Sequence, residues 1–151
     1  MFHIVLHQPE IPQNTGSIGR LCVNTGCALH LIHPLGFDVT DAQLRRAGLD
    51  YWKELAPAHY ENWDDFLARS PAKHLWLATT KATRTHTQAA YEPGDGIVLG
   101  QETRGLPEEI LRQYANSLIT IPMPGRFTRS LNLSQAAAIV LYEALRQVKG
   151  W

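Results

Sequence analysis

The chain has 151 residues, of which 44% are hydrophobic, and its 14 basic and 14 acidic side chains give a formal net charge of zero. This length and composition predict one globular domain over residues 1–151, and the balanced charge argues against a general nucleic-acid coat protein, which usually has a strong basic excess. No apolar run is long enough to predict a membrane span, the N-terminus lacks the pattern of a signal peptide, and two cysteines make no disulfide framework, so we expect a cytoplasmic protein.

The first predicted strand is the short apolar run His3–Leu6. Asn14 and Thr15 are candidate N-caps of a helix that ends at Gly26. Asn14 and Arg20 then lie near the carboxyl end of the first strand, where open parallel sheets bind ligands. A simple cap is an equally good interpretation of Asn14, and a solvated helix residue is the alternative for Arg20.

The second predicted strand runs from Cys27 to His33. Together with Cys22, the residues Cys27, His30 and His33 loosely imitate the spacing of zinc ligands. In a strand, however, His30 and His33 point to opposite faces and cannot meet one ion. The pattern therefore favours buried structural residues, and we expect no metal site.

A short basic helix is predicted over Asp41–Ala47 and carries Arg45 and Arg46. The residues Tyr51–Lys53 follow it with two aromatic rings and a further basic group. Such a set is suited to hold an RNA phosphate and to stack a base, but a solvated helix face with a packed tryptophan fits equally well. A second amphipathic helix is predicted to begin near Glu61 or Asn62.

The segment His74–Thr80 predicts a buried strand, and a polar, basic loop from Lys81 to Thr87 follows it. This loop should lie at the same sheet edge as Asn14. It is a fair candidate for phosphate contact, and a plain surface loop is the alternative.

The next predicted strand, Ile97–Leu99, runs directly into a loop that contains Glu102 and Arg104. Gly100 and Gly105 in this loop allow a close backbone approach to a ligand or a positive φ. A helix is predicted after it, because proline suits a first turn and two glutamates favour the positive end of the helix dipole.

The last predicted strand is Ser117–Ile121, and the last helix carries an apolar stripe over Leu133–Val148. Small residues at Ala136–Ala138 would let another backbone approach closely. Apolar side chains also lie off the main stripe, which predicts either a central core helix or a helix that also contacts a second subunit. The sequence does not choose among three possible N-caps of this helix: Ser130, Asn132 and Ser134.

Alternating strands and helices predict an α/β fold with a mainly parallel sheet and helices on both faces. The loops that follow the strands ending near Thr80, Gly100 and Ile121 should converge on one crevice. The chain has no G-x-G-x-x-G fingerprint, no Walker loop and no G-x-S-x-G elbow, which argues against NAD enzymes, ATPases and hydrolases.

Three separated stretches together resemble the ordered motifs of one enzyme family. They are PQNTGSIGRL from Pro12, IVLGQETRGLP from Ile97, and SLNLSQAAAIVLYEALRQ from Ser130. They resemble the motifs of the SPOUT-class RNA 2′-O-ribose methyltransferases, and the resemblance covers nearly the whole chain. By its length, the chain most resembles the minimal branch without an added RNA-binding domain, which methylates the wobble nucleotide of tRNA, position 34, as cytidine or modified uridine.

This resemblance implies a deep C-terminal trefoil knot and a bent S-adenosyl-L-methionine held in it largely by backbone groups, with S-adenosyl-L-homocysteine as product and no metal. Backbone recognition is physically sensible because main-chain groups in a rigid loop bind the adenine edge without a rotamer cost. By position, the resemblance assigns the contacts to Ala78, Thr79, Gly100, Ile121, Met123, Ser130 and Leu131.

The same resemblance implies Arg20 as the candidate base, helped by Asn14, Glu102 and Asn132. Arginine normally stays protonated at pH 7, so we expect Arg20 to position the 2′-hydroxyl and a phosphate, with Glu102 as its ion-pair partner. The basic residues expected to meet RNA are Arg45, Arg46, Lys81, Arg84, Arg104 and Arg129.

One small neutral subunit offers little surface to a tRNA, so we expect a homodimer through the first and last helices, an arrangement that allows each site to be built from both chains. No membrane partner is expected. Two alternatives stay open: a 2′-O-methyltransferase that acts on another tRNA position or on rRNA, and an RNA- or nucleotide-binding module without catalysis.

Overall fold

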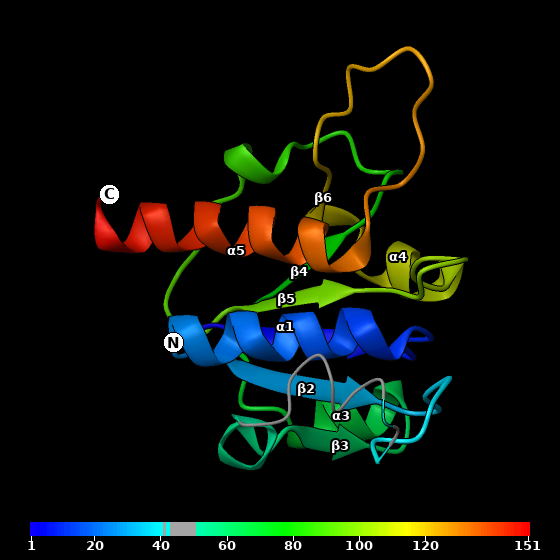
Figure 1. The fold of residues 1–151 in the computed structure, drawn as a ribbon. Coiled ribbons are helices and arrows are strands. Elements are labelled where there is room, and N and C mark those ends of the chain that lie inside the picture. Colours follow the sequence, from blue (N-terminus) through cyan, green and yellow to red (C-terminus); the bar gives the residue numbers. More distant parts are fainter. Residues whose placement is uncertain (41, 43–50) are drawn as a thin grey trace.

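A six-stranded parallel sheet forms the centre of the computed structural model, which describes residues 1–40, 42 and 51–151 (Figure 1). The strand order is β3-β2-β1-β5-β4-β6, and every neighbouring pair is parallel. The strands are β1 (His3–His7), β2 (Ala28–Ile32), β3 (Ala58–Tyr60), β4 (Leu75–Ala78), β5 (Gly96–Leu99) and β6 (Leu118–Ile119). The predicted α/β class with a parallel sheet is therefore confirmed.

Helices cover both faces of this sheet, as predicted. Side chains of α1 and α5 share one apolar cluster with the sheet, and side chains of α3 and α4 share the other. Figure 1 shows α1 and α5 side by side on the face nearest the viewer, with α3 behind the sheet. The helices are α1 (Pro12–Thr25), α3 (Trp63–Arg69), α4 (Glu108–Gln113) and α5 (Leu133–Lys149), with short 3-10 turns η1 (His86–Gln88) and η2 (Ala115–Ser117).

Strand periodicity divides the core between the two faces. In β1, Ile4 and Leu6 belong to the cluster under α1 and α5, whereas Val5 belongs to the cluster under α3 and α4. All three side chains are fully buried. Because neighbouring residues of a strand point to opposite faces, a strand covered on both sides is apolar at every position, which explains the continuous apolar runs in the sequence.

Some predicted boundaries are wrong. Helix α1 begins at Pro12 with Ile11 in the N-cap position, so Asn14 and Thr15 lie inside its first turn and do not cap it. Proline is favoured in the first turn because its missing N–H has no intrahelical partner there. The predicted last strand is shorter, since Ser117 belongs to η2.

Strand β3, which pairs with β2 at the sheet edge, was not predicted at all. Apart from Ala42, the predicted helix over Asp41–Ala47, with Arg45 and Arg46, lies outside the described residues.

The helix ends follow known capping rules. Gly26 ends α1 in the left-handed region at φ 68°, as predicted. Asn132 is the N-cap of α5, because its Oδ1 accepts hydrogen bonds from the backbone N–H groups of Ser134 and Gln135. No helix in the described part of the chain combines the length and the apolar character that a membrane span requires.

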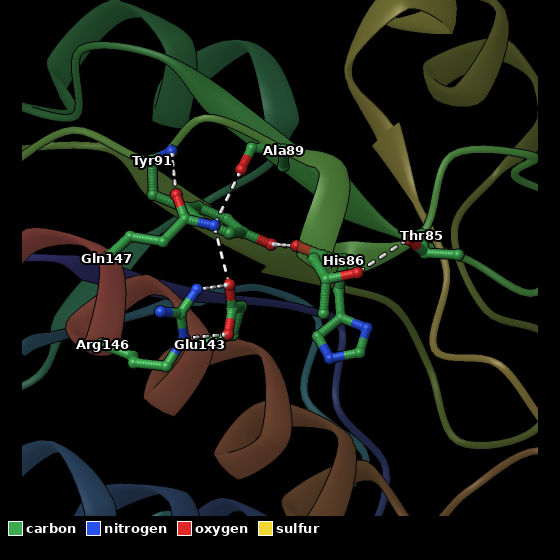
Figure 2. A network of polar contacts seen from close by, with 8 residues as sticks. Thr85, His86, Ala89, Tyr91, Glu143, Arg146 and Gln147 are labelled. Atoms are coloured by element: carbon green, nitrogen blue, oxygen red, sulfur yellow. Dashed lines mark hydrogen bonds and ion pairs between the residues drawn. The ribbon is translucent and has the colours of Figure 1, made fainter. Parts of the chain in front are cut away.

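A polar cluster attaches the C-terminal half of α5 to residues 86–91, and we call it the Gln147 clamp (Figure 2). The Gln147 side chain accepts a hydrogen bond from the Tyr91 backbone N–H at 3.2 Å and donates to the Ala89 carbonyl at 3.0 Å. It also donates to Glu143, which in turn accepts two hydrogen bonds from Arg146. The clamp therefore binds the last helix to the segment that follows β4.

Candidate functional site

A cavity of about 460 Å³ opens at the carboxyl edge of the sheet, and we call it the first cavity. Most of its wall comes from the segments that follow β4, β5 and β6 and from the start of α5. These segments are residues 78–81, 99–106, 119–121 and 130–133. The predicted convergence of three loops on one crevice is therefore confirmed.

Backbone hydrogen bonds hold the segments after β4 and β6 together. Thr79 N–H donates to the Ile119 carbonyl at 2.9 Å, which continues the pairing of these strands. Thr120 then bonds in both directions to the next part of the first segment, donating to the Arg84 carbonyl at 2.9 Å and accepting from His86 N–H at 2.8 Å. The wall of the first cavity is thus fixed by main-chain contacts between residues far apart in sequence.

Glycines shape the segment after β5. Gln101 and Gly105 form an antiparallel bridge, and Gly105 has a φ of 67°, which is one of the two alternatives predicted for the glycines of this loop. A Cβ at Gly100 would lie 2.2 Å from the Gly105 carbonyl carbon, so only glycine fits there. The close approach at Gly100 is therefore made by the backbone of its own loop.

Glu102 joins this loop to the start of α1. Its carboxylate accepts hydrogen bonds from Glu10 N–H at 2.8 Å and Ile11 N–H at 3.2 Å. Asn14 Nδ2 approaches the same carboxylate at 3.5 Å, and Asn14 is 6% exposed. The carboxylate thus satisfies the backbone N–H groups at the start of α1, as an anion at a helix N-terminus does.

The hydrogen bonds continue from α1 to α5. Asn132 Nδ2 donates to Asn14 Oδ1 at 3.0 Å, while Asn132 Oδ1 accepts from Ser134 Oγ at 2.6 Å and caps α5. The result is an ordered chain of side chains from Glu102 through Asn14 to Asn132, which we call the amide relay. All three of its members line the first cavity.

The structure brings together every residue that the resemblance assigned to the cofactor. Ala78, Thr79, Gly100, Ile121, Met123, Ser130 and Leu131 all line the first cavity. Sequence reasoning missed Gln101, Leu133 and Ala136 as further lining residues, although each is close in sequence to a predicted one.

Arg20 lies outside the first cavity of its own chain. It is exposed on α1, and its Nε donates a hydrogen bond to the Tyr51 hydroxyl at 3.0 Å. The prediction of an ion pair between Arg20 and Glu102 is wrong in this chain. Glu102 instead accepts hydrogen bonds from the backbone N–H groups of Glu10 and Ile11.

The predicted RNA-binding residues have different surroundings. Lys81 forms an ion pair with Glu108, and this hydrogen-bonded lysine holds the pKa of the Glu108 carboxyl below its usual value. Arg84 donates to the Asn116 carbonyl at 2.7 Å and lies over the Trp76 ring. Arg104 lines the first cavity, whereas Arg129 is exposed on the loop before α5.

Cys22, Cys27 and His30 are buried, whereas His33 is half-buried. His30 is hydrogen-bonded to His3 and Tyr60 at 2.9 Å each, and burial lowers the pKa of its imidazole to about 4. His33 instead contacts His59, so the two histidines do not converge. No group of three or more potential metal ligands occurs within the described residues.

Comparison with known proteins gives a consistent result. The family model described as the SpoU rRNA Methylase family matches residues 1–142. A tRNA (cytidine(34)-2′-O)-methyltransferase of Saccharophagus degradans is 50% identical over 149 residues, which cover 98% of this chain and 96% of that protein.

Solved structures agree with this similarity. A structure described under 2-OH methylation of C/U34 on tRNA superposes with a TM-score of 0.94 at 41% identity, covering 100% of this chain and 98% of the other. An AdoMet-bound rRNA methyltransferase from Sinorhizobium meliloti superposes with a TM-score of 0.79 at 27% identity, covering 96% of this chain and 56% of the other.

Proposed function

Because this chain belongs to the SpoU rRNA methylase family, we propose that it is a tRNA 2′-O-methyltransferase that acts on the ribose of the wobble nucleotide, position 34, with S-adenosylmethionine as methyl donor. The similarity to a cytidine-34 enzyme over nearly the whole of both chains supports the substrate. The observation that carries the proposal is the first cavity, where three loops and the amide relay meet.

The residues of the first cavity fit S-adenosylmethionine. The volume of about 460 Å³ lies within the usual range for small-molecule sites. Leu99, Ile121 and Leu131 supply apolar wall for an adenine, and the loop backbones supply the donors and acceptors that its edge needs. We assign the donor contacts to Ala78, Thr79, Gly100, Ile121, Met123, Ser130 and Leu131.

When bound, S-adenosylmethionine supplies a methyl group already activated on a sulfonium sulfur. The chain must align the ribose 2′-hydroxyl with that methyl group and promote the loss of the hydroxyl proton. Asn14 Oδ1 accepts one hydrogen bond from Asn132, which leaves it one lone pair for a hydroxyl hydrogen, and Asn132 Nδ2 keeps a second N–H. Glu102 fixes the amide of Asn14 and so orients the relay.

Arg20 enters the reaction through a dimer. It is exposed on α1 and outside the cavity of its own chain, so a homodimer through α1 and α5 brings it to the cavity of the partner subunit. There the guanidinium positions the RNA phosphate and the 2′-hydroxyl, since arginine stays protonated at pH 7.

Exposed apolar side chains support this dimer. Val23 on α1 and Ile139 and Tyr142 on α5 are 37%, 39% and 49% exposed, although both helices are buried on their sheet side. A shared face of two neighbouring helices is a common kind of isologous interface. Exposed apolar groups of this kind mark protein interfaces when they gather in a patch.

The C-terminal segment threads through the loop after β4 to form a deep trefoil knot. The bonds of Thr120 to Arg84 and His86, together with the Gln147 clamp, support this threading, because β6 and α5 are both fastened to residues 84–91. Small side chains at Ala136 and Ala137 leave room for the close packing that a knot requires.

The RNA contacts come from basic residues around the first cavity. Arg104 on its wall and Arg129 on the loop before α5 meet phosphates, and Lys81 and Arg84 add further basic groups. Arg45 and Arg46, which lie outside the described residues, are assigned the same role from the sequence. Phosphate contacts of this kind position an RNA, whereas its bases are read where a loop splays them out. A protein with these partners acts in the cytoplasm.

Incubation with labelled S-adenosylmethionine and total tRNA tests the activity. We expect label in tRNA that survives alkaline hydrolysis as a dinucleotide, because a 2′-O-methyl group blocks cleavage at that position. Mapping should place it at nucleotide 34. Label at another tRNA position or only in rRNA would contradict the assigned substrate, and donor binding without transfer to any RNA would contradict the activity.

Mixed dimers test the role of Arg20. In Arg20→Ala homodimers we expect no transfer but an unchanged affinity for the donor. Co-expression of an Arg20→Ala chain with an Asn14→Ala chain should restore about a quarter of the wild-type rate, because half of the dimers are mixed and each mixed dimer contains one intact site. No recovery would show that Arg20 does not act across the interface.

A further inference from the structure

A second cavity, of about 370 Å³, lies beside the first at the carboxyl edge of the sheet. The two cavities share five lining residues, most of them in the loop after β5, so they lie on either side of this loop. These residues are Lys81, Gln101, Arg104, Gly105 and Leu106. The second cavity also has His7, Gln8, Pro107 and Glu108, which do not line the first.

Gln8 takes up an unfavourable backbone conformation at this cavity. Its φ is 52°, in the left-handed region that side chains other than glycine, asparagine and aspartate rarely adopt. Its N–H donates to the Ile32 carbonyl at 2.9 Å, which holds the residue directly after β1. Strained residues of this kind gather at binding sites, because the surrounding fold must hold them in place.

The carboxamides in the second cavity are poorly satisfied within the protein. Gln101 Nε2 approaches Gln8 Oε1 only at 3.4 Å, and no other side-chain hydrogen bond of either amide occurs among the described residues. Each carboxamide offers two donor hydrogens and two acceptor lone pairs. A ligand with an edge of alternating donors and acceptors would therefore satisfy groups that the fold leaves open.

The charge in the second cavity favours a base over a phosphate. The ion pair of Lys81 with Glu108 places a carboxylate on the wall and offsets the lysine, so Arg104 is left as the unpaired cation in the described cavity lining. His7 is 4% exposed, and burial lowers the pKa of its imidazole, which favours the neutral form. A phosphate prefers several cations, whereas a nucleobase is recognised by amides and apolar surface.

We propose that the second cavity binds one nucleobase of the RNA substrate, recognised by the side-chain amides of Gln8 and Gln101 beside the guanidinium of Arg104. This inference rests on the proposed function, because it places an RNA base next to the cavity where its ribose, or that of a neighbour, is methylated. The site supplies base recognition close to the reacting sugar, which phosphate contacts alone do not provide.

The test uses Gln8→Ala, which removes the amide but keeps the β-carbon and the backbone strain. With an anticodon stem-loop RNA as substrate, we expect the KM for RNA to rise about tenfold, as loss of one base contact implies. The affinity for S-adenosylmethionine should stay unchanged, because Gln8 does not line the first cavity. Gln113→Ala, an exposed glutamine of α4, is the matched control and should keep the wild-type KM.

A second measurement identifies the base. RNAs that each lack one base of the loop are compared on wild-type protein and on Gln8→Ala. At one position, removal of the base should raise the KM of the wild type and abolish the difference between the two proteins. If every such RNA preserves the difference, or if Gln8→Ala keeps the wild-type KM, the inference is wrong.

A third variant separates loss of the side chain from relief of the backbone strain. Gln8→Gly also removes the amide but relieves the positive φ, so an equal rise in KM for both variants assigns the effect to the side chain. A normal KM in Gln8→Gly would instead assign the effect to strain and overturn the inference. Absence of methyl transfer by the wild type would contradict the proposed function itself.

Discussion

The polar side chains at the two ends of α5 differ in how many of their hydrogen-bonding positions are used within the fold. At the C-terminal end, the Gln147 amide accepts a hydrogen bond from Tyr91 N–H and donates hydrogen bonds to the Ala89 carbonyl and to Glu143 (Figure 2). At the N-terminal end, Asn132 uses its oxygen to cap the helix and one N–H to hold Asn14, and its side chain borders an open cavity.

This difference separates a structural role from a functional one within a single helix. Polar groups whose hydrogen bonds are all made within the fold contribute to stability. Ordered polar groups that keep a free donor or acceptor are positioned to bind a ligand. We therefore expect changes at the N-terminal end to affect catalysis and changes at the C-terminal end to affect stability. The predictions below test that division, beginning with the largest effect.

Asn132→Asp should lower the rate of methyl transfer about a hundredfold with little change in melting temperature. Aspartate is as good an N-cap as asparagine, but it cannot donate a hydrogen bond to Asn14 Oδ1, so the amide relay is broken. Single-turnover kinetics and thermal unfolding measure the two quantities. Asn62→Asp, the same exchange at the N-cap of α3, is the control. Equal loss of activity in both variants would contradict a specific role of Asn132.

Ala137→Leu should lower the free energy of unfolding by about 1–3 kcal/mol, the usual cost of overpacking a close-packed core. Ala137 is fully buried between the two ends of α5, so the larger side chain has no free space. Denaturant unfolding measures this cost. Ala138→Leu adds the same atoms at a half-buried position and should cost less. A fully stable Ala137→Leu variant would show that the packing is not tight.

Gln147→Ala should lower the free energy of unfolding by about 1–2 kcal/mol, because the Tyr91 N–H and the Ala89 carbonyl lose their partner. The rate of methyl transfer at room temperature should stay near the wild-type value. Gln135→Ala, at an exposed side chain of the same helix, controls for the loss of a glutamine. A large loss of activity in Gln147→Ala without loss of stability would break the division between the two ends.

Acid should weaken the Gln147 clamp and so lower the free energy of unfolding. Of the four predicted effects, we expect this one to be the smallest. Hydrogen bonds from Arg146 and Gln147 lower the pKa of the Glu143 carboxyl from 4.5 to about 2. As the pH falls, Glu143 therefore takes up a proton at a higher pH in the unfolded chain than in the folded one. The stabilisation that ionised Glu143 gives the folded state is complete above pH 4.5 and is lost as the pH falls toward 2.

Stability measured against pH in the wild type and in Glu143→Gln isolates this effect. The curves should differ above pH 4.5 and converge toward pH 2. The buried His30, whose pKa is about 4 instead of 6.5, also costs stability as the pH falls from 6.5 to 4, but it does so equally in both proteins. Parallel curves would show that Glu143 does not titrate as described.

Periodicity and motif spacing were enough to predict the sheet and the meeting of three loops. Buried parallel strands give continuous apolar runs, and their carboxyl ends share one edge. Strand β3 was missed because Ala58–Tyr60 is three residues long, follows a proline and contains an exposed histidine, so it has no apolar run.

The hydrogen-bond partners inside the site could not be predicted from the sequence, for a different reason. Glu102 was expected to pair with Arg20, yet it satisfies the backbone N–H groups of Glu10 and Ile11, 92 and 91 residues away. Every residue except proline has the same main-chain N–H donor, so only the folded path shows which of them a carboxylate meets.

The first cavity draws its wall from residues as far apart as Ile11 and Val140. A ribosome must therefore have made almost the whole polypeptide before the first cavity can form, and a prematurely ended product lacks this cavity. A small molecule that fits this pocket raises the melting temperature by mass action only for the finished chain. A rise in melting temperature on adding S-adenosylmethionine therefore reports a chain in which the first cavity has formed, before any RNA is added.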